Sequence, residues 1–425
     1  MKIGLIVTFL CYNYNRFMAK RLLISLLSAL FIISLATTII FYGRGYRFDP
    51  SKQKLNPTGI LSVSSYPEKA SIYIDDKLIS ATNASLSLSP GWYQVKVSRD
   101  GYQSWEKKIR IQGEVVSQVD ALLIPNNPSL KALTSTGINK PTLSHSGTKV
   151  AYVVTDADTN PATLKSKNGV YVLELRSGAL GSSPESKQIF FAESRYDYDT
   201  AKIYWSADEK EIILAFRDPK SKSQLPNLAY LISVENTQTV PVIVTSRMQV
   251  ILDEWQTELD LKKNLKLEAL PESLAGFLAT NSADIRFSPD ETKILYTATN
   301  SGTLLPVINP PLIGVNPTEE KRNIAKNKIY VYDNKEDKNY HLADLDLKIT
   351  PPNIPLWYTD SKHLVTVEET RINIVDYDGT NIRSVYGGPF LENLVLPWAS
   401  GGKIVILTNL NRPESPADLY EVDLR

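Results

Sequence analysis

Cysteine and histidine are scarce in this sequence, which restricts the chemistry that its side chains can perform. The 425 residues include one cysteine, Cys11, so neither an intramolecular disulfide nor a thiolate metal cluster can form. The three histidines, His145, His341 and His363, are scattered along the chain. We interpret them as exposed or half-buried residues of strands and turns. The sequence therefore predicts no metal site.

An excess of charge of one sign is also absent. The chain carries 47 Lys and Arg against 46 Asp and Glu, a formal net charge of +1. Proteins that bind nucleic acid normally neutralise phosphates with a basic face. We therefore expect no nucleic-acid partner.

Catalytic motifs are missing as well. The chain has no Gly-x-Ser-x-Gly elbow, no His-Glu-x-x-His helix and no phosphate-binding Gly-x-x-x-x-Gly-Lys-Ser/Thr loop. The acidic turns Asp156-Ala157-Asp158 and Asp376-Tyr377-Asp378-Gly379 suggest calcium, but neither has the spacing of a calcium loop that ends in a bidentate Glu. We interpret them as solvated turns. The sequence predicts no catalytic residue and no cofactor, and it leaves the ligand unknown.

One long hydrophobic run stands near the N-terminus. No residue from Leu22 to Tyr42 is charged. At about 1.5 Å per residue, a helix of this length crosses a hydrocarbon core of roughly 30 Å. Tyr42 and Tyr46 lie where an interfacial aromatic belt is expected. We predict a transmembrane helix over residues 22–42.

The charges that flank this run predict its orientation. Lys20 and Arg21 precede the run, which favours a cytoplasmic tail over residues 1–21 and an extracytoplasmic remainder in the cell membrane. Two alternatives stay open. Ser34-Leu35-Ala36 could be the cleavage site of a signal peptide, and Met18 rather than Met1 could be the first residue translated.

A period-2 pattern follows a polar linker over residues 43–58. Ile72 and Ile74 alternate with polar residues, as do Val95 and Val97, and Asp100-Gly101 is typical of a hairpin turn in which both residues have φ > 0. Short strands over residues 59–124 predict a compact β-sandwich.

This segment resembles the PEGA domain family. The namesake motif stands as Pro67-Glu68-Lys69-Ala70, and Pro90-Gly91-Trp92-Tyr93-Gln94-Val95 and Gly101-Tyr102 match later landmarks. Lys69 and Asp76 occupy positions where the family has glycine. The resemblance implies an interaction or spacer module at a cell surface. Its aromatic residues could stack on a sugar ring, but we expect them to fill the sandwich or to form cross-strand pairs; they are Trp92, Tyr93, Tyr102 and Trp105.

A short phrase then recurs five times, at Leu143, Trp205, Phe287, Trp357 and Trp398, the last copy shortened by one residue. An apolar residue precedes a small polar turn, a Lys or polar residue and a β-rich apolar run. The copy Phe287-Ser288-Pro289-Asp290 resembles the TolB-like, WD-type propeller repeat. We predict an all-β chain whose residues 128–425 form a five-bladed β-propeller, with six blades as the alternative.

Three further expectations concern this repeat region. No outer strand follows Asp418–Val422, so we expect Leu130–Thr134 to pair with it and close the ring. Leu252, Trp255 and Leu259 predict a helical insertion near 250–278 that packs on the propeller. The proline-rich insertion from Ser301 to Asn327 predicts an extended loop, a place where recognition is common.

These features favour a non-catalytic binding or scaffolding protein of the cell envelope, with an envelope protein or cell-wall polysaccharide as partner and the lipid bilayer contacted through the N-terminal helix. The alternative is a propeller-based hydrolase that acts on glycans. Such chemistry needs two or three acids in one cleft, and Asp208, Asp290 and Asp360 share one position of the repeated phrase. We expect these three residues to form turns.

Overall fold

The computed structural model describes residues 2–43, 46–49, 54–155, 168–176, 184–191, 198–217, 226–235, 240–346, 353–368, 370–412 and 414–424. The chain divides into two compact units. The first comprises Met1–Val95, Lys108–Ala121 and Ile313–Pro317, and the second comprises Lys96–Lys107, Leu122–Leu312 and Thr318–Arg425. The protein is mostly β, with one apolar helix at its N-terminus.

Helix α1 runs from Lys2 to Gly43 and so continues through the predicted tail. Its segment Leu23–Gly43 has a mean hydropathy of 2.5 and is 0% buried, which makes it long and apolar enough to cross a membrane. The side chains of Leu23, Phe31 and Ile39 are each more than half exposed. A helix that buries none of its apolar residues in protein fits a lipid environment.

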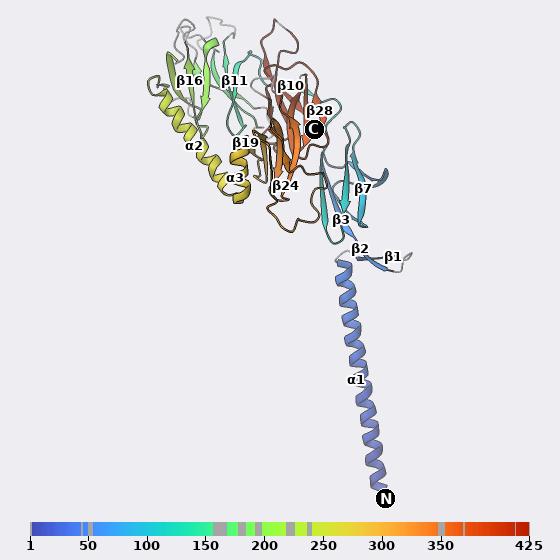
Figure 1. Ribbon diagram of the computed structural model, residues 1–425. Helices are drawn as coiled ribbons and strands as arrows, with labels where there is room; N and C mark the ends of the chain where they lie inside the picture. The colour runs from blue at the N-terminus through green and yellow to red at the C-terminus, as the bar shows by residue number, and fades with distance from the viewer. Residues whose placement is uncertain are drawn as a thin grey trace. The chain divides into compact units, whose positions relative to one another are not determined.

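A small sandwich follows α1 and the hairpin formed by β1 (Tyr46–Asp49) and β2 (Lys54–Pro57). One sheet has the order β6-β3-β9 and the other β5-β4-β7-β8 (Figure 1). The predicted alternation is present, because Ile72, Ile74 and Val95 are buried. The strands are β3 (Gly59–Tyr66), β4 (Ser71–Ile74), β5 (Lys77–Ala81), β6 (Ala84–Leu88), β7 (Gly91–Ser98), β8 (Trp105–Ile111) and β9 (Val116–Leu122).

The turns of this sandwich keep left-handed backbone where the PEGA resemblance expects glycine. Lys69 has φ 61° and Asp76 has φ 63°, so the turn geometry survives without the glycines. Strands β7 and β8 are neighbours on either side of Asp100-Gly101, as the hairpin prediction requires, but the predicted turn type is wrong. Gly101 has φ 81°, but Asp100 is not left-handed, and the connection between β7 and β8 is longer than a two-residue hairpin.

The second unit contains five four-stranded antiparallel sheets within the described part of the chain. In chain order we call them sheets 1 to 5. Sheet 1 is β11 (Asn139–Leu143), β12 (Lys149–Val154), β13 (Gly169–Glu174) and β14 (Ser186–Phe191). Sheet 2 is β15 (Lys202–Trp205), β16 (Glu211–Phe216), β17 (Leu228–Ser233) and β18 (Val242–Ile243). Sheet 3 is β19 (Ser282–Phe287), β20 (Lys293–Ala298), β23 (Lys328–Asp333) and β24 (Lys338–Asp344). Sheet 4 is β25 (Leu356–Trp357), β26 (His363–Glu368), β27 (Arg371–Asp376) and β28 (Arg383–Tyr386). Sheet 5 is β10 (Leu130–Ala132), β31 (Asp418–Asp423), β30 (Lys403–Thr408) and β29 (Val395–Pro397).

The pairing of Leu130–Thr134 with the last strand is present. Leu130 pairs with Val422 and Ala132 with Tyr420 in the antiparallel pair β10–β31. The hydroxyl of Thr134 donates to Asp418 Oδ1 at 2.7 Å and accepts the Leu419 N–H at 2.9 Å. Strand β10, the first strand of the repeat region, therefore completes the sheet that contains β31, the last strand.

In each of the five sheets of the second unit, the repeated phrase forms the turn between two strands that are consecutive in the chain, and the strand pairing has the same register each time. The first residue of each copy pairs with the residue seven positions later: Leu143 with Val150, Trp205 with Ile212, Phe287 with Ile294, Trp357 with Leu364 and Pro397 with Ile404. The fifth residue has positive φ in every copy, at Gly147, Glu209, Glu291, Ser361 and Gly401.

This register corrects the reading of the fifth copy. The copy begins at Pro397 and has full length, and Trp398 occupies the position that Ser144, Ser206 and Ser288 hold elsewhere. Because Trp205 and Trp357 begin their copies, the sequence pattern placed Trp398 at the first position, one residue too late. The Trp398 ring is 1% exposed and belongs to the packing between sheets 5 and 1.

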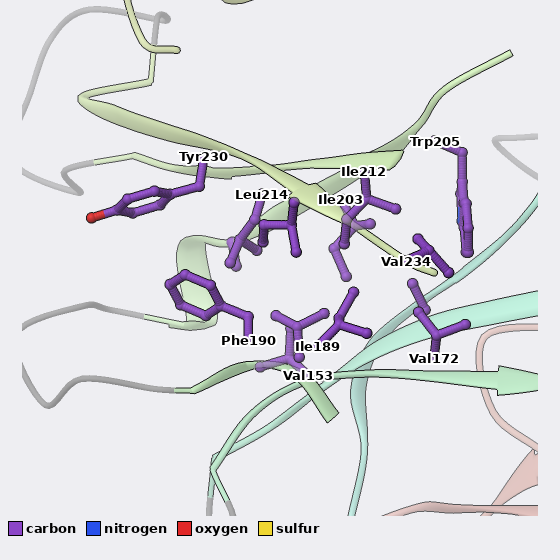
Figure 2. Close-up of a cluster of buried hydrophobic side chains, with 14 of the residues drawn as sticks. Val153, Val172, Ile189, Phe190, Ile203, Trp205, Ile212, Leu214, Tyr230 and Val234 are labelled. Carbon is purple, nitrogen blue, oxygen red and sulfur yellow. The ribbon is translucent and has the colours of Figure 1, made fainter. Parts of the chain in front are cut away.

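Alternating residues of each central strand pack on different neighbours. In β16, Ile212 and Leu214 pack against sheet 1 (Figure 2), and Ile213 packs against helix α2 (Met248–Glu268). In β30, Ile404 packs with sheet 4 and Val405 with sheet 1. Buried clusters thus join sheet 1 to 2, 3 to 4, 4 to 5 and 5 to 1.

Helices α2 and α3 (Glu272–Asn281) cover the remaining faces of sheets 2 and 3 (Figure 1). Met248 and Ile251 of α2 are buried on sheet 2, and Trp255 packs on the same cluster. Leu274 and Leu278 of α3 are 0% exposed on sheet 3. The predicted helical insertion therefore packs on the sheets through its apolar stripe.

The insertion from Ser301 to Asn327 is extended. Its two ends are held together by the short pair β21 (Gly302–Thr303) and β22 (Asn323–Ile324). Its residues Ile313–Pro317 cluster with the first unit.

Candidate functional site

The three carboxylates of the repeated phrase serve the turns in which they lie. The Oδ1 atom of Asp208 accepts the Ser206 hydroxyl at 2.7 Å and the Lys210 N–H at 3.1 Å. Asp290 accepts the equivalent donors of Ser288 and Thr292 at 2.7 and 3.1 Å. Short Asp side chains favour such turns because they bond the backbone two residues ahead.

These hydrogen bonds keep the three carboxylates ionised. The Ser206 hydroxyl lowers the pKa of Asp208. Partial burial opposes ionisation of Asp290, but its hydrogen bonds outweigh burial and lower its pKa to about 2. Burial also opposes ionisation of Asp360, and the neighbouring His363 lowers its pKa. The acid of a glycosidase needs the opposite shift, a raised pKa.

The turn Asp376-Tyr377-Asp378-Gly379 is buried, so its interpretation as a solvated turn was wrong. Asp376 is 6% exposed and Asp378 is 4% exposed. Asp376 Oδ2 accepts the indole N–H of Trp105 at 3.1 Å and the Asn381 amide at 2.9 Å. These donors hold the carboxylate in place.

His363 is the centre of this cluster. Its Nδ1 lies 2.6 Å from Asp360 Oδ2 and its Nε2 lies 3.3 Å from Asp376 Oδ1. Burial disfavours the charged ring, but the two carboxylates outweigh burial and raise the pKa of His363 to about 10. The imidazole is therefore a cation at neutral pH and cannot act as a general base.

The expectation of exposed or half-buried histidines holds for two of the three. His145 is exposed and its Nε2 lies 3.2 Å from the Trp205 carbonyl, and the half-buried His341 pairs with the exposed Asp344 at 2.9 Å. His363 is the exception, at only 3% exposed. It is the first residue of strand β26 and pairs with the buried Asp376 of β27.

Asp378 is held by a second cation. It accepts hydrogen bonds from the Lys107 ammonium and from the Thr318 and Thr380 hydroxyls. Burial opposes the charged form, but Lys107 and these donors lower the pKa of Asp378 to about 2. With Arg383, which donates to the Ser104 carbonyl at 3.1 Å, the cluster has as many cations as carboxylates.

This cluster holds two distant parts of the chain together. It fixes residues 103–107 to sheet 4, and every carboxylate in it is matched by a cation or a hydrogen-bond donor. Across the described ranges, no group of three or more His, Cys, Asp or Glu could hold a metal ion. Asp156-Ala157-Asp158 lies outside the described residues.

The four aromatic residues of the sandwich have different environments. Trp105 is 3% exposed, but its indole N–H bonds Asp376, so this side chain lies against sheet 4. Tyr93 and Tyr102 are half-buried, and the Tyr93 hydroxyl donates to the Ser89 carbonyl at 2.9 Å. Trp92 is 51% exposed and lies between two cations, with Lys108 Nζ 5.6 Å and Arg110 Cζ 6.0 Å from its ring centroid.

The comparison of the sequence with family models agrees with the motifs of the sandwich. The PEGA domain model matches residues 58–126. The resemblance predicted from Pro67–Ala70 is confirmed. A comparison with curated proteins finds no match.

Solved structures include propeller proteins among the chains similar to this one. TolB from Acinetobacter baumannii is 12% identical with a TM-score of 0.16, over 76% of this chain and 53% of that one. Putative TolB from Agrobacterium tumefaciens is 12% identical with a TM-score of 0.18, over 87% and 99%. Oligogalacturonate lyase from Vibrio parahaemolyticus is 8% identical with a TM-score of 0.21, over 89% and 96%. The architecture of this chain is shown by the pairing of its own strands.

Proposed function

We propose that this protein is a single-pass membrane protein with a non-catalytic binding or scaffolding role at the cell envelope. The observation that supports it is the span Leu23–Gly43, whose apolar side chains are unburied and which leads directly into β modules. Lys20 and Arg21 precede this span, which supports a cytoplasmic N-terminus and extracytoplasmic β modules.

The second unit fits a closed ring of five blades in which the helices take a sixth position. Four buried clusters connect the sheets in the order 2-1-5-4-3. Sheets 2 and 3 are at the two ends of this order. The face of sheet 2 that contacts no other sheet packs on α2, and that of sheet 3 packs on α3. Lys262 Nζ donates to the Ala207 carbonyl at 3.0 Å, and Lys266 pairs with Glu291 at 2.8 Å, so α2 contacts the phrase turns of both sheets.

This ring explains the length of the insertion between sheets 2 and 3. A sheet that lacks a neighbour exposes an apolar face, which must be covered. Helices α2 and α3 cover these faces with Trp255, Leu274 and Leu278. The six-bladed alternative then corresponds to five β blades and one helical segment.

A binding role is favoured over glycan hydrolysis because the three aspartates of the repeated phrase form turn hydrogen bonds. Asp208, Asp290 and Asp360 hold their own turns, and each has a lowered pKa. A propeller whose polar residues are used for construction offers its loops for recognition. We expect an envelope protein or cell-wall polysaccharide as the ligand.

The experiment is a pair of binding assays on the full chain in nanodiscs, one on an array of cell-wall glycans and one by crosslinking in cells followed by mass spectrometry. A specific ligand in either assay supports the proposal, and two empty assays contradict it. Hydrolysis of a glycan that is lost in the Asp208→Asn, Asp290→Asn and Asp360→Asn variants would establish the hydrolase alternative.

A further inference from the structure

The connection between helix α1 and the sandwich is short and folded back on itself. Tyr46 lies three residues after Gly43 and pairs with Pro57, and Gly59 begins the sandwich two residues later. The rings of Phe41 and Tyr46 lie 5.0 Å apart edge to face, and the Tyr46 hydroxyl donates to Glu114 at 2.6 Å.

This connection limits how far the sandwich can lie from the end of the helix. Three extended residues span about 10 Å, and a pair of antiparallel strands adds about 5 Å. Pro57 therefore lies within about 15 Å of the end of α1 in any arrangement of the joint. The headgroup layer of each leaflet extends about 5–7 Å beyond the hydrocarbon core. Where α1 spans a bilayer, this end of the sandwich lies no more than about 10 Å beyond the headgroup layer.

Several strand ends meet at this end of the sandwich. A Cβ atom on Gly113 would lie 3.0 Å from Pro57 Cβ and 3.7 Å from Pro90 Cγ. Gly113 follows β8, and Pro90 precedes β7. The first residues of β7 and the last residues of β8 are thus beside the strand that connects to the helix.

This end exposes aromatic, cationic and aliphatic side chains together. Trp92 is 51% exposed and is flanked by Lys108 and Arg110. Within the described part of the chain, neither cation forms an ion pair. Val116, at the start of β9, is 57% exposed.

The proline-rich insertion adds one more apolar residue at the same end. The Gly314 N–H donates to the Gln112 side chain at 2.6 Å, and Gln112 is the residue before Gly113. A Cβ atom on Gly314 would lie 2.1 Å from Val115 Cγ1, so the loop is packed closely on the sandwich. The neighbouring Ile313 is 71% exposed. We call Trp92, Lys108, Arg110, Val116 and Ile313 the proximal patch.

We propose that the proximal patch binds the anionic headgroup layer of the same bilayer that α1 crosses. Trp prefers the membrane interface because its ring is amphipathic. Lys and Arg near the surface are attracted to anionic lipid, and long side chains reach the phosphates. Val116 and Ile313 contribute apolar area beside these groups. Glu114 also lies at this end, and its carboxylate accepts the Tyr46 hydroxyl.

This contact gives the protein a second attachment to the membrane, which restrains the sandwich at the surface. The inference rests on the proposed anchor, because a free chain would not be held near lipid. Its occupant is the lipid surface rather than an anionic wall polymer, because the short joint keeps this end of the sandwich close to the headgroups.

The test uses photocrosslinking of the full chain in nanodiscs. A benzophenone amino acid replaces Trp92 in one variant and Tyr66 in its matched control. Tyr66 is also a partly exposed aromatic residue, at 41%, but it ends the eight-residue strand β3 that Gly59 begins. An eight-residue strand is roughly 23 Å long, so Tyr66 lies at the end of β3 that is far from the joint with α1.

We expect several-fold more lipid adducts at position 92 than at position 66 in nanodiscs that contain phosphatidylglycerol. Lys108→Gln and Arg110→Gln should each reduce the adducts about fivefold, and phosphatidylcholine alone should give a similar reduction. Equal yields at the two positions would overturn the proposal. Adducts that form at position 92 with added poly(glycerol phosphate) and not with lipid would overturn it in favour of a wall polymer.

Two failures remain distinguishable in this experiment. A chain that does not enter nanodiscs refutes the anchor, and the proposed function and this inference fall together. A chain that enters nanodiscs but gives no excess of adducts at position 92 refutes the proximal patch alone.

Discussion

Replacement of His363 tests whether the buried cluster of sheet 4 is a structural device. The ring is 3% exposed and lies within ion-pair distance of Asp360 and Asp376. In the His363→Gln variant, two carboxylates lose their cation while Asp376 stays buried. Removal of one partner of a buried ion pair costs about 3–5 kcal/mol. We expect a loss of this size in the free energy of unfolding near pH 6.

The pH dependence gives a second signature. The folded pKa of His363 is raised to about 10, above the value near 6.5 in an unfolded chain. The folded protein therefore keeps the proton while the unfolded chain loses it between pH 6.5 and 10. The stabilisation is complete below pH 6.5 and is lost as the pH rises towards 10, at up to about 1.4 kcal/mol per pH unit. The variant should lack this component.

The assay is denaturant unfolding of the full chain in nanodiscs at pH 6, 7, 8 and 9. His341→Gln is the matched control, because its partner Asp344 has a side chain that is 70% exposed. Exposed pairs contribute about 0–1 kcal/mol, so the control should stay within this range. A His363→Gln variant that loses less than about 1 kcal/mol, or that keeps the wild-type pH slope, would refute the reasoning.

Three further predictions use the same unfolding measurement. Thr134→Val removes the hydroxyl that bonds Asp418 and should cost about 1–3 kcal/mol, with faster amide exchange in β31; unchanged exchange would contradict the role of β10. Lys69→Gly relieves left-handed backbone at φ 61° and should stabilise the protein by about 1 kcal/mol, whereas a loss would mean that the side chain matters more than the strain. Asp378→Asn leaves Lys107 without its carboxylate and should destabilise the protein at pH 7. Because the folded pKa of Asp378 is lowered to about 2, wild-type stability should fall as the pH drops from about 4 to 2, and a variant that keeps this acid slope would disprove the assignment.

The sequence predicted the elements of the fold where local signals were strong. The apolar run from Leu22, the alternation at Ile72 and Ile74, and the phrase at Phe287 each appear as the predicted helix or strands. The pairing of Leu130 with Val422 could be predicted because an unpaired last strand needs a partner. Pattern alone could not place the fifth copy. Register is set by pairing, and pairing puts Pro397 rather than Trp398 at the first position.

The buried cluster could not be predicted from the sequence in the same way. Asp376 and Asp378 stand in a turn that looks solvated, and nothing near them in the chain shows that Trp105 and Lys107 cover them. These partners lie 271 residues away in sequence. The exposure of Trp92 could not be predicted either, because the face on which a strand residue lies depends on the register of its neighbours. The sequence does contain one indication of this exposed face: Lys108 and Arg110 are two residues apart on β8, so their side chains lie on the same face of the strand.

The membrane topology of the chain tests the central claim most directly, and the single cysteine makes the measurement simple. Cys11 precedes the span, and Ser301→Cys places a second thiol at an exposed position of the second unit. A membrane-impermeant maleimide added to intact cells should label residue 301 at once and should label Cys11 only after the membrane is opened. Protection of residue 301 in intact cells, or labelling of Cys11 from outside, would contradict the account.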